Sequence, residues 1–291
     1  MKVLITGKNG QVGSCLVSQL TDIPSIDFLA LGREELDITN ADQVNEVVNK
    51  YQPTVIINAA AYTAVDKAES EVELANAINN IGPKNLAKAA SNVKAVILHI
   101  STDYVFAGNK DGLYTESDEV KPQGVYGQTK FAGEQSVEQE CAAHIILRTA
   151  WVFSEYGNNF VKTMLRLAQT HDTLGVVGDQ FGGPTYAGDI AKALINIAQQ
   201  LQQGTTKFGV YNYSGYPHVS WHEFATEIFA KALSQQVIET PVMVNAISTS
   251  EYPTPAKRPA NSKLDCSKVT KNFSVQPSDW KAALNTIQQY K

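Results

Sequence analysis

Short apolar, β-branched runs alternate with helical patterns through the first 150 residues. Nearly continuous apolar character is typical of parallel strands that are buried on both faces. The runs are Val3–Ile5, Phe28–Leu31, Val55–Ile57, Val96–Ile100 and Ile145–Leu147. Between them apolar residues recur at helical spacing, as in Val12, Leu16 and Leu20. This alternation predicts an α/β fold, a Rossmann-type doubly wound parallel sheet.

The strand–helix rhythm loosens after residue 150. We expect residues 1–150 to form a dinucleotide-binding domain, with returning segments near 173–178 and 208–214. Residues 151–291 should mainly build a smaller α/β substrate-binding domain. The tract 249–262 is rich in Pro and Ser, which predicts either a plain surface loop or a loop that folds over a substrate.

The composition excludes several classes of protein. A net charge of −5 argues against nucleic-acid binding, which needs a clustered basic face. Cys15, Cys141 and Cys266 form no metal-spaced pair and fit reduced thiols, so we expect a cytoplasmic protein. No apolar run approaches the roughly 18 residues of a membrane span, so no membrane association is expected.

A glycine turn follows the first predicted strand and opens a helix. Its spacing is G-x-x-G-x-x-G, over Gly7, Gly10 and Gly13. Such a turn lets the backbone approach a pyrophosphate, whose charge then meets the helix N-terminus. We therefore predict that these glycines, with Gln11 and Val12, bind a dinucleotide.

The end of the second strand should choose between NADH and NADPH. An acid there binds the adenosine ribose diol, whereas an arginine accommodates a 2′-phosphate. The chain has Gly32 and Arg33 at this point, which favours NADPH, with NADH as the alternative. Arg33 as a solvated surface charge is the competing interpretation. Asp37 and Ile38 could lie against the adenine.

A phenol and an ammonium, Tyr126 and Lys130, lie four residues apart, one turn of a helix. A neighbouring Lys⁺ stabilises a phenolate and makes the phenol a usable acid or base. Thr102 and Asp103 directly follow a predicted strand, at the edge where open α/β sheets bind ligands. Asn58–Thr63 ends the preceding strand at the same edge, and its small residues would let the backbone approach a cofactor ribose.

Together these motifs resemble the extended short-chain dehydrogenase/reductase family, and within it the reductases of 4-keto nucleotide sugars. The resemblance runs through almost the whole chain. It includes Gly7–Gly13, Asn58–Thr63, Ala64–Glu69, Ser101–Phe106, Val125–Lys130, Arg148–Phe153, Asn158–Met164, Asp179–Thr185 and Arg258–Ser262.

The resemblance implies reduction by NADPH or NADH of the C4 ketone of dTDP-4-dehydro-6-deoxy-L-mannose to dTDP-L-rhamnose, a polysaccharide precursor. Tyr126 would protonate the developing alkoxide, Lys130 would lower the phenol's pKa and bind the ribose, and Thr102 would hold the ketone. The implied cofactor contacts also include Ala61, Tyr62, Thr63 and Ile100. The implied substrate contacts are Thr102, Asp103, Trp151, Gln180, Arg258 and Asn261. Asp103 would contact the sugar or tune the acidity of the site.

Two departures from the family pattern and two alternatives complete the interpretation. Gly32 stands where the family often has an acid. Cys15 stands where some members have an acidic magnesium ligand, so we expect no metal site, and either a monomer or a homodimer.

A nucleotide-sugar epimerase or dehydratase is the alternative enzyme, but Tyr104 follows Asp103 where a dehydratase usually has an acid. A non-catalytic regulatory subunit of the kind that binds methionine adenosyltransferase is the other alternative.

Overall fold

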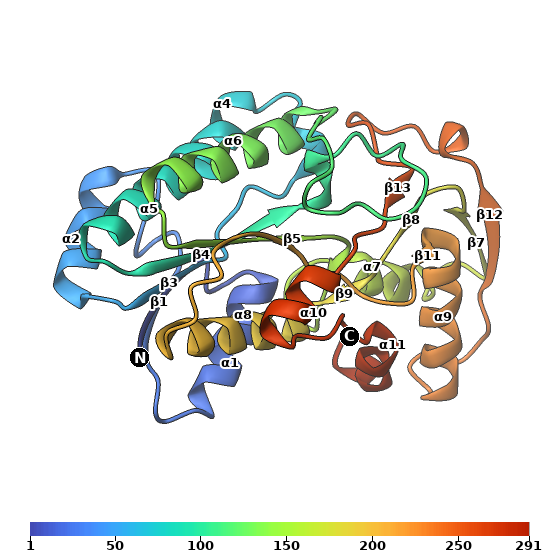
Figure 1. The fold of residues 1–291 in the computed structure, drawn as a ribbon. Helices are drawn as coiled ribbons and strands as arrows, with labels where there is room; N and C mark the ends of the chain where they lie inside the picture. Colours follow the sequence, from blue (N-terminus) through green and yellow to red (C-terminus); the bar gives the residue numbers. More distant parts are fainter. Residues whose placement is uncertain (291) are drawn as a thin grey trace.

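The computed structural model describes residues 1–290, and its centre is a six-stranded sheet with the order β10-β5-β4-β3-β1-β2 (Figure 1). All neighbouring pairs in this sheet are parallel. The strands are β1 (Lys2–Thr6), β2 (Asp27–Leu31), β3 (Val55–Asn58), β4 (Val96–Thr102), β5 (His144–Thr149) and β10 (Gly209–Asn212). The predicted doubly wound parallel sheet is confirmed.

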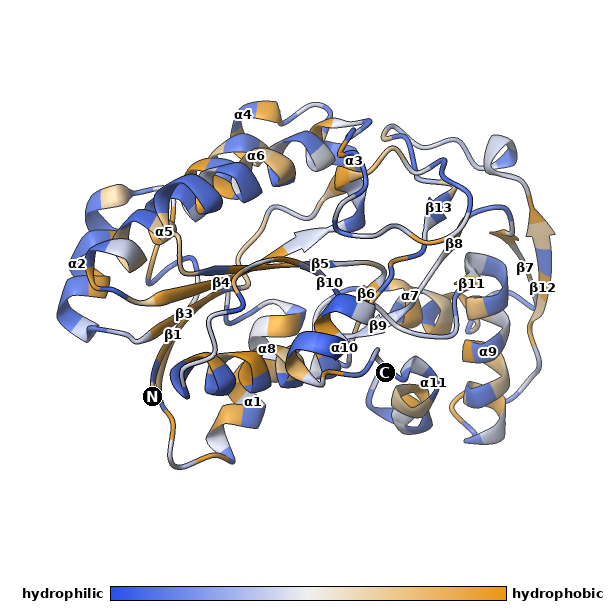
Figure 2. Ribbon diagram, viewed as in Figure 1, coloured by the Kyte–Doolittle hydropathy of each residue, from blue (hydrophilic) through white to orange (hydrophobic). Residues whose placement is uncertain are grey.

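Helices cover both faces of this sheet (Figure 1). On one face lie α2 (Ala41–Tyr51), α5 (Gly82–Asn92) and α6 (Val125–Glu140); on the other lie α1 (Gln11–Thr21), α8 (Ala187–Gln202) and α10 (Ser267–Phe273). Successive strand residues alternate between the two faces, so Val3 and Ile5 pack with α1 and α8, and Leu4 packs with α2 and α5. Both faces of the strands are therefore apolar, as Figure 2 shows for β1, β3 and β4.

A second group of elements lies beyond the carboxyl edge of the sheet. Its helices are α7 (Phe160–Leu167), α9 (Trp221–Ser234), α11 (Trp280–Ala283) and the 3-10 turn Leu284–Tyr290. Its strands form three small sheets: β7 (Thr173–Val177) with β12 (Met243–Ile247), β6 (Val152–Phe153) with β9 (Thr185–Tyr186), and β11 (Val219–Ser220), β8 (Phe181–Gly182) and β13 (Asn261–Ser262).

The two segments expected to return to the large sheet behave differently. Segment 208–214 contains β10, at the edge of that sheet. The expected return of segment 173–178 was wrong, because β7 pairs with β12 outside the large sheet. Val176 is buried against α7 and α9, so β7 serves the second core.

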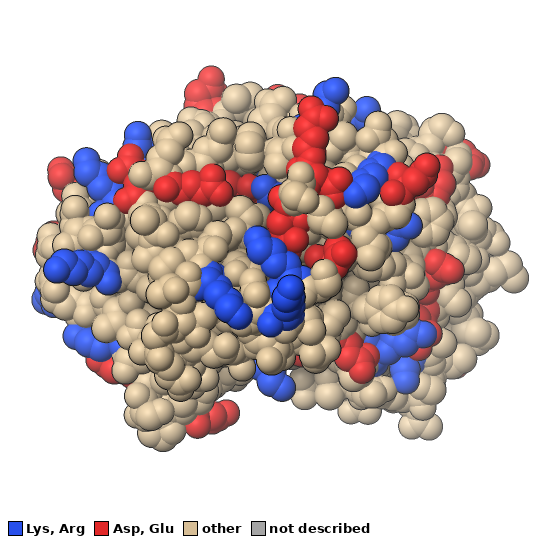
Figure 3. Space-filling view, viewed as in Figure 1, with Lys and Arg blue, Asp and Glu red and all other residues tan. Residues whose placement is uncertain are grey.

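Short helices connect the strands near the carboxyl edge. They are α3 (Val65–Ala68), α4 (Val72–Asn76), the π-helical turn Ala77–Ile81, and the 3-10 turns Asp103–Val105 and Thr249–Glu251. Within residues 1–290, no helix is both long and apolar enough to cross a membrane. Acidic and basic side chains are interspersed on the face drawn in Figure 3.

Candidate active site

A cavity of about 620 Å³ opens at the carboxyl ends of β1, β3, β4 and β5. Gly10, Gln11 and Val12 line it at the start of α1, and Ala61, Thr63 and Ile100 line it from the neighbouring strand ends. Thr102, Asp103, Tyr126 and Lys130 also face it. The cavity thus brings the glycine turn and the Tyr/Lys pair together.

The glycine turn is built by close backbone contacts. Gly7 has φ +76°, and a Cβ on it would lie 2.6 Å from the Ala60 nitrogen. A Cβ on Gly13 would lie 2.1 Å from the Gly7 carbonyl oxygen. Gly7 and Gly13 therefore allow tight packing of turn, strand and helix, while Gly10 is an N-cap without a side-chain cap on α1. Uncapped N–H groups at a cavity wall fit the pyrophosphate of a dinucleotide.

Lys130 is buried, with 2% of its surface exposed. Its Nζ donates to the Ile100 carbonyl oxygen at 2.7 Å and lies 3.5 Å from Nε2 of His99. Burial lowers the pKa of Lys130 to about 8, and the nearby Glu134 carboxylate opposes this change. His99, a core residue on β4, is in turn 3.0 Å from the Asn58 amide nitrogen. Asn58 and His99 thereby form a chain of polar contacts that ends at the Lys130 ammonium, and no local sequence signal indicated this role.

The pKa of Tyr126 departs from the sequence prediction. Burial raises it above its usual value, a hydrogen bond with Thr102 opposes the rise, and Asp103 and Tyr104 add to it. Burial therefore outweighs the lowering by Lys130 that the sequence predicted. Because the phenol keeps its proton at neutral pH, it is suited to act as a proton donor.

Tyr126 is placed by a close approach of two backbones. A Cβ on Gly127 would lie 2.2 Å from the Tyr104 carbonyl oxygen and 3.0 Å from Cβ of Pro122. The Glu69 carboxylate accepts the Val125 N–H at 2.9 Å and holds the first turn of α6. Residue 127 must therefore be glycine for Tyr126 to reach the cavity.

We expect Gly127→Ala to lower turnover by about a hundredfold, because a displacement of about 1 Å is enough to misalign reacting groups. The measurement is the steady-state rate beside the far-UV spectrum of the variant. Gln128→Ala, at an exposed position of the same turn, is the matched control. Equal rates for the two variants would contradict this account.

Asp103 is buried and holds two hydroxyl groups. One oxygen accepts from Thr102 at 3.0 Å, and the other accepts from Ser262 of β13. Burial raises the pKa of Asp103 to about 6, and both hydroxyls oppose the rise. Asp103 therefore fixes the Thr102 side chain and joins it to the carboxyl-terminal part of the chain. Sequence reasoning placed Ser262 in the matched stretch Arg258–Ser262 but gave it no role, because its partner Asp103 is distant in the chain.

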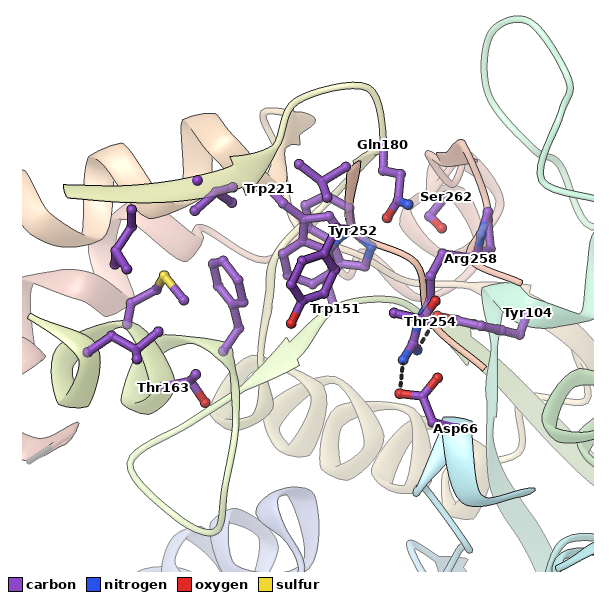
Figure 4. Close-up of a pocket in the computed structure, with 18 residues that line it drawn as sticks. Asp66, Tyr104, Trp151, Thr163, Gln180, Trp221, Tyr252, Thr254, Arg258 and Ser262 are labelled. Atoms are coloured by element: carbon purple, nitrogen blue, oxygen red, sulfur yellow. Dashed lines mark hydrogen bonds and ion pairs between the residues drawn. The ribbon is translucent and has the colours of Figure 1, made fainter. Parts of the chain in front are cut away.

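A second cavity of about 490 Å³ adjoins the first, and the two share Tyr104, Trp151, Trp221 and Arg258 (Figure 4). The Trp151 ring stacks on Trp221, with centroids 3.5 Å apart. Trp151 has φ +50°, a strained backbone for a bulky residue. Sequence reasoning missed Trp221, because only the fold brings it onto Trp151.

Arg258 and Gln180 also line the second cavity. Arg258 donates to the Tyr104 hydroxyl at 3.0 Å and to the Asp66 carboxylate at 2.5 Å, contacts drawn as dashed lines in Figure 4. The Gln180 amide donates to Thr249 at 3.0 Å. The tract 249–262 contributes Tyr252, Thr254, Arg258 and Ser262 to the wall, as expected of a loop that folds over a substrate.

Several predicted contacts lie outside both cavities. The Asn261 amide donates to the Lys110 and Gly112 carbonyls, at 2.6 and 2.8 Å, so it holds a neighbouring loop and lines neither cavity. Ile38 is buried in the core against Gly82, and its side chain lines neither cavity. The Asp37 carboxylate accepts hydrogen bonds from the N–H and the hydroxyl of Thr39, and the Tyr62 hydroxyl donates to Glu71. Arg33 is exposed at the end of β2.

Cys15, on α1, is a buried free thiol. Burial raises the pKa of the Cys15 thiol to about 12, and Glu155 and Asp189 add to the rise. Over residues 1–290, no three His, Cys, Asp or Glu side chains are grouped to hold a metal ion.

Residues 1–291 match the family described as RmlD substrate binding domain. The chain belongs to this family. It is 53% identical, over 99% of both chains, to the dTDP-4-dehydrorhamnose reductase of Aggregatibacter actinomycetemcomitans.

Two solved structures carry the same description. That of the dTDP-4-dehydrorhamnose reductase from Clostridium acetobutylicum superposes with a TM-score of 0.91 at 42% identity, covering 99% of this chain and 98% of that one. That of the Bacillus anthracis enzyme, in complex with NADP, superposes with a TM-score of 0.91 at 38% identity, covering 100% of this chain and 99% of that one. These relatives extend over both cavities, so the family likeness is not confined to the dinucleotide part.

Proposed function

We propose that this chain catalyses the NADPH-dependent reduction of the C4 ketone of dTDP-4-dehydro-6-deoxy-L-mannose to dTDP-L-rhamnose, with NADH as a second cofactor. The observation that carries this proposal is the placement of Tyr126, Lys130 and Thr102 in one cavity that opens onto a second, aromatic cavity with Arg258. The family relationship and the NADP complex of the Bacillus anthracis relative support it.

The first cavity fits a nicotinamide dinucleotide. The uncapped start of α1 would take the pyrophosphate, the backbone at Ala61 and Thr63 would take the ribose, and Lys130 would hold the ribose hydroxyls. The bound nicotinamide supplies the hydride. Tyr126 donates its phenolic proton to the C4 oxygen as negative charge develops there. Thr102 lines the same cavity, and its hydroxyl would turn from Asp103 to donate to the same oxygen and hold it in place.

The second cavity fits the nucleotide part of the substrate. Trp151 and Trp221 offer flat apolar surface, and Gln180 offers an amide. Arg258 is the cation suited to a diphosphate, because its planar donors match two phosphate oxygens. Asp66 holds the guanidinium at the cavity wall before the substrate arrives.

We expect Arg258→Lys to raise KM about tenfold with a smaller change in kcat, because lysine cannot reproduce the bidentate contact. Initial rates against substrate concentration measure this. Lys257→Arg, one residue earlier and outside both cavities, is the control. A fall in kcat at unchanged KM would place Arg258 in the chemical step instead.

The decisive experiment supplies dTDP-4-dehydro-L-rhamnose and follows the loss of nicotinamide absorbance with NADPH or NADH. Formation of dTDP-L-rhamnose is the expected result. Cofactor binding without oxidation would favour the regulatory subunit, and isomerisation without net oxidation would favour an epimerase. Asp103 followed by Tyr104 supports a reductase over a dehydratase.

We propose that the protein acts in the cytoplasm, as a monomer or a homodimer. The three cysteines are free, as suits a reducing compartment.

A further inference from the structure

A carboxylate occupies the end of β2 although the sequence has glycine there. Oε2 of Glu35 accepts the Gly32 N–H at 2.8 Å. Nζ of Lys8, in the glycine turn, lies 2.6 Å from the same oxygen and 2.7 Å from Oε1. The N–H groups of Gly7 and Lys8 both donate to the Leu31 carbonyl, at 3.0 and 3.2 Å. The glycine turn and the end of β2 therefore form one connected unit.

Gly32 leaves the room that this arrangement needs. A Cβ on Gly32 would lie 2.8 Å from the Asn9 amide nitrogen and 3.5 Å from the Glu35 carboxylate. A larger residue at position 32 would therefore require the Asn9 side chain to move aside. The carboxylate comes from a side chain three residues later in the chain, Glu35, which folds back onto the Gly32 amide.

In a dinucleotide-binding fold, a carboxylate at this position affects which cofactor binds. An acid at the end of the second strand accepts hydrogen bonds from the adenosine ribose diol and repels a 2′-phosphate. Hydrogen bonds from Lys8 and then from Gly32 lower the pKa of Glu35, so it is ionised at neutral pH. Lys8 has the opposite preference, because an ammonium binds phosphate as a point charge.

We propose that Glu35 and Lys8 together set the cofactor preference, with Glu35 favouring NADH and Lys8 favouring NADPH. Glu35 pairs with Lys8 and neutralises its charge, and a 2′-phosphate would compete with Glu35 for Lys8. With this pair, a chain without an acid at position 32 would be able to bind both cofactors. This inference rests on the proposed function.

The test is equilibrium titration of each cofactor by nicotinamide fluorescence, without substrate. We expect Glu35→Gln to tighten NADPH binding about fivefold and to weaken NADH binding by a similar factor, as for an exposed charged contact. Glutamine keeps an acceptor for the Gly32 N–H, so the loop retains its hydrogen bond. Lys8→Gln should weaken NADPH binding about fivefold and leave NADH nearly unchanged.

Glu34→Gln is the matched control, because Glu34 is exposed and adjacent and the variant has the same net charge. It should leave the ratio of the two dissociation constants unchanged. The effect of Glu35→Gln on NADPH should also shrink in about 1 M salt, where screening acts within a few ångström.

Equal effects of Glu34→Gln and Glu35→Gln, or an unchanged cofactor ratio in both Glu35→Gln and Lys8→Gln, would overturn this assignment. The proposed function fails differently: the native chain would then bind neither cofactor, or would bind them without reducing the keto sugar. The two failures are therefore separable.

Discussion

Tyr126→Phe is expected to lower turnover of the keto sugar by about 10²- to 10⁴-fold, the usual contribution of a positioned general acid. The substitution removes the only atom of Tyr126 that can donate a proton and retains the ring that packs edge-on against Tyr104. Because the glycine turn and Lys130 are untouched, binding of NADPH should remain within about twofold, since uniform binding contacts are separate from the chemical step.

Single-turnover oxidation of bound NADPH measures the turnover of the keto sugar, and fluorescence titration measures the binding of NADPH. Tyr216→Phe is the control, because Tyr216 is 66% exposed and lies outside both cavities of the site. Turnover that survives in Tyr126→Phe at the native level would remove Tyr126 from the mechanism. Loss of cofactor binding together with turnover would reassign it to binding.

Glu134→Ala is expected to lower the free energy of unfolding by about 3 to 5 kcal/mol, the cost of leaving a buried charge unpaired. Glu134 lies on α6 one turn after Lys130, and Arg148 lies on β5. Their side chains are 2% and 4% exposed and meet in two hydrogen bonds, of 2.9 and 2.6 Å. Without the carboxylate, the guanidinium of Arg148 stays in the core with no counter-charge.

Urea unfolding followed by circular dichroism measures this change. Glu140→Ala is the control on the same helix, because its ion pair with Lys84 is long, at 3.8 Å, and partly exposed, so about 0.5 kcal/mol is expected. The double variant Glu134→Leu with Arg148→Met should recover most of the loss, since an apolar pair removes both charges. A loss in Glu134→Ala no larger than that in Glu140→Ala would show that the pair is unimportant for stability.

Much of the sheet and of the catalytic set could be predicted because their signals are local. A strand buried on both faces needs a continuous apolar run, and four such runs became β1, β3, β4 and β5, while the fifth became the partly exposed edge strand β2. The Tyr126 and Lys130 side chains share a helix face through their spacing alone. Thr102 and Asp103 are at the site because the carboxyl ends of parallel strands meet at one edge.

Predictions failed where the decisive partner is distant in the chain. The run at 173–178 is apolar enough for the large sheet, yet β7 pairs with residues 243–247. Asn261 belongs to a motif that reaches the site, but its own amide turns toward Lys110 and Gly112. Neighbouring residues of one motif can thus differ in role, because their side chains point to different parts of the structure.

The sequence by itself determined the doubly wound sheet, the glycine turn and the Tyr126/Lys130 pair on one helix face, because periodicity, glycine spacing and helical spacing act within a few residues. Only the tertiary structure decided that burial and not Lys130 governs the pKa of Tyr126, and that Ser262 anchors Asp103. It also placed Glu35 in the space left by Gly32. Burial, electrostatic environment and contacts across the chain depend on the packing of all the elements, and no local pattern encodes them.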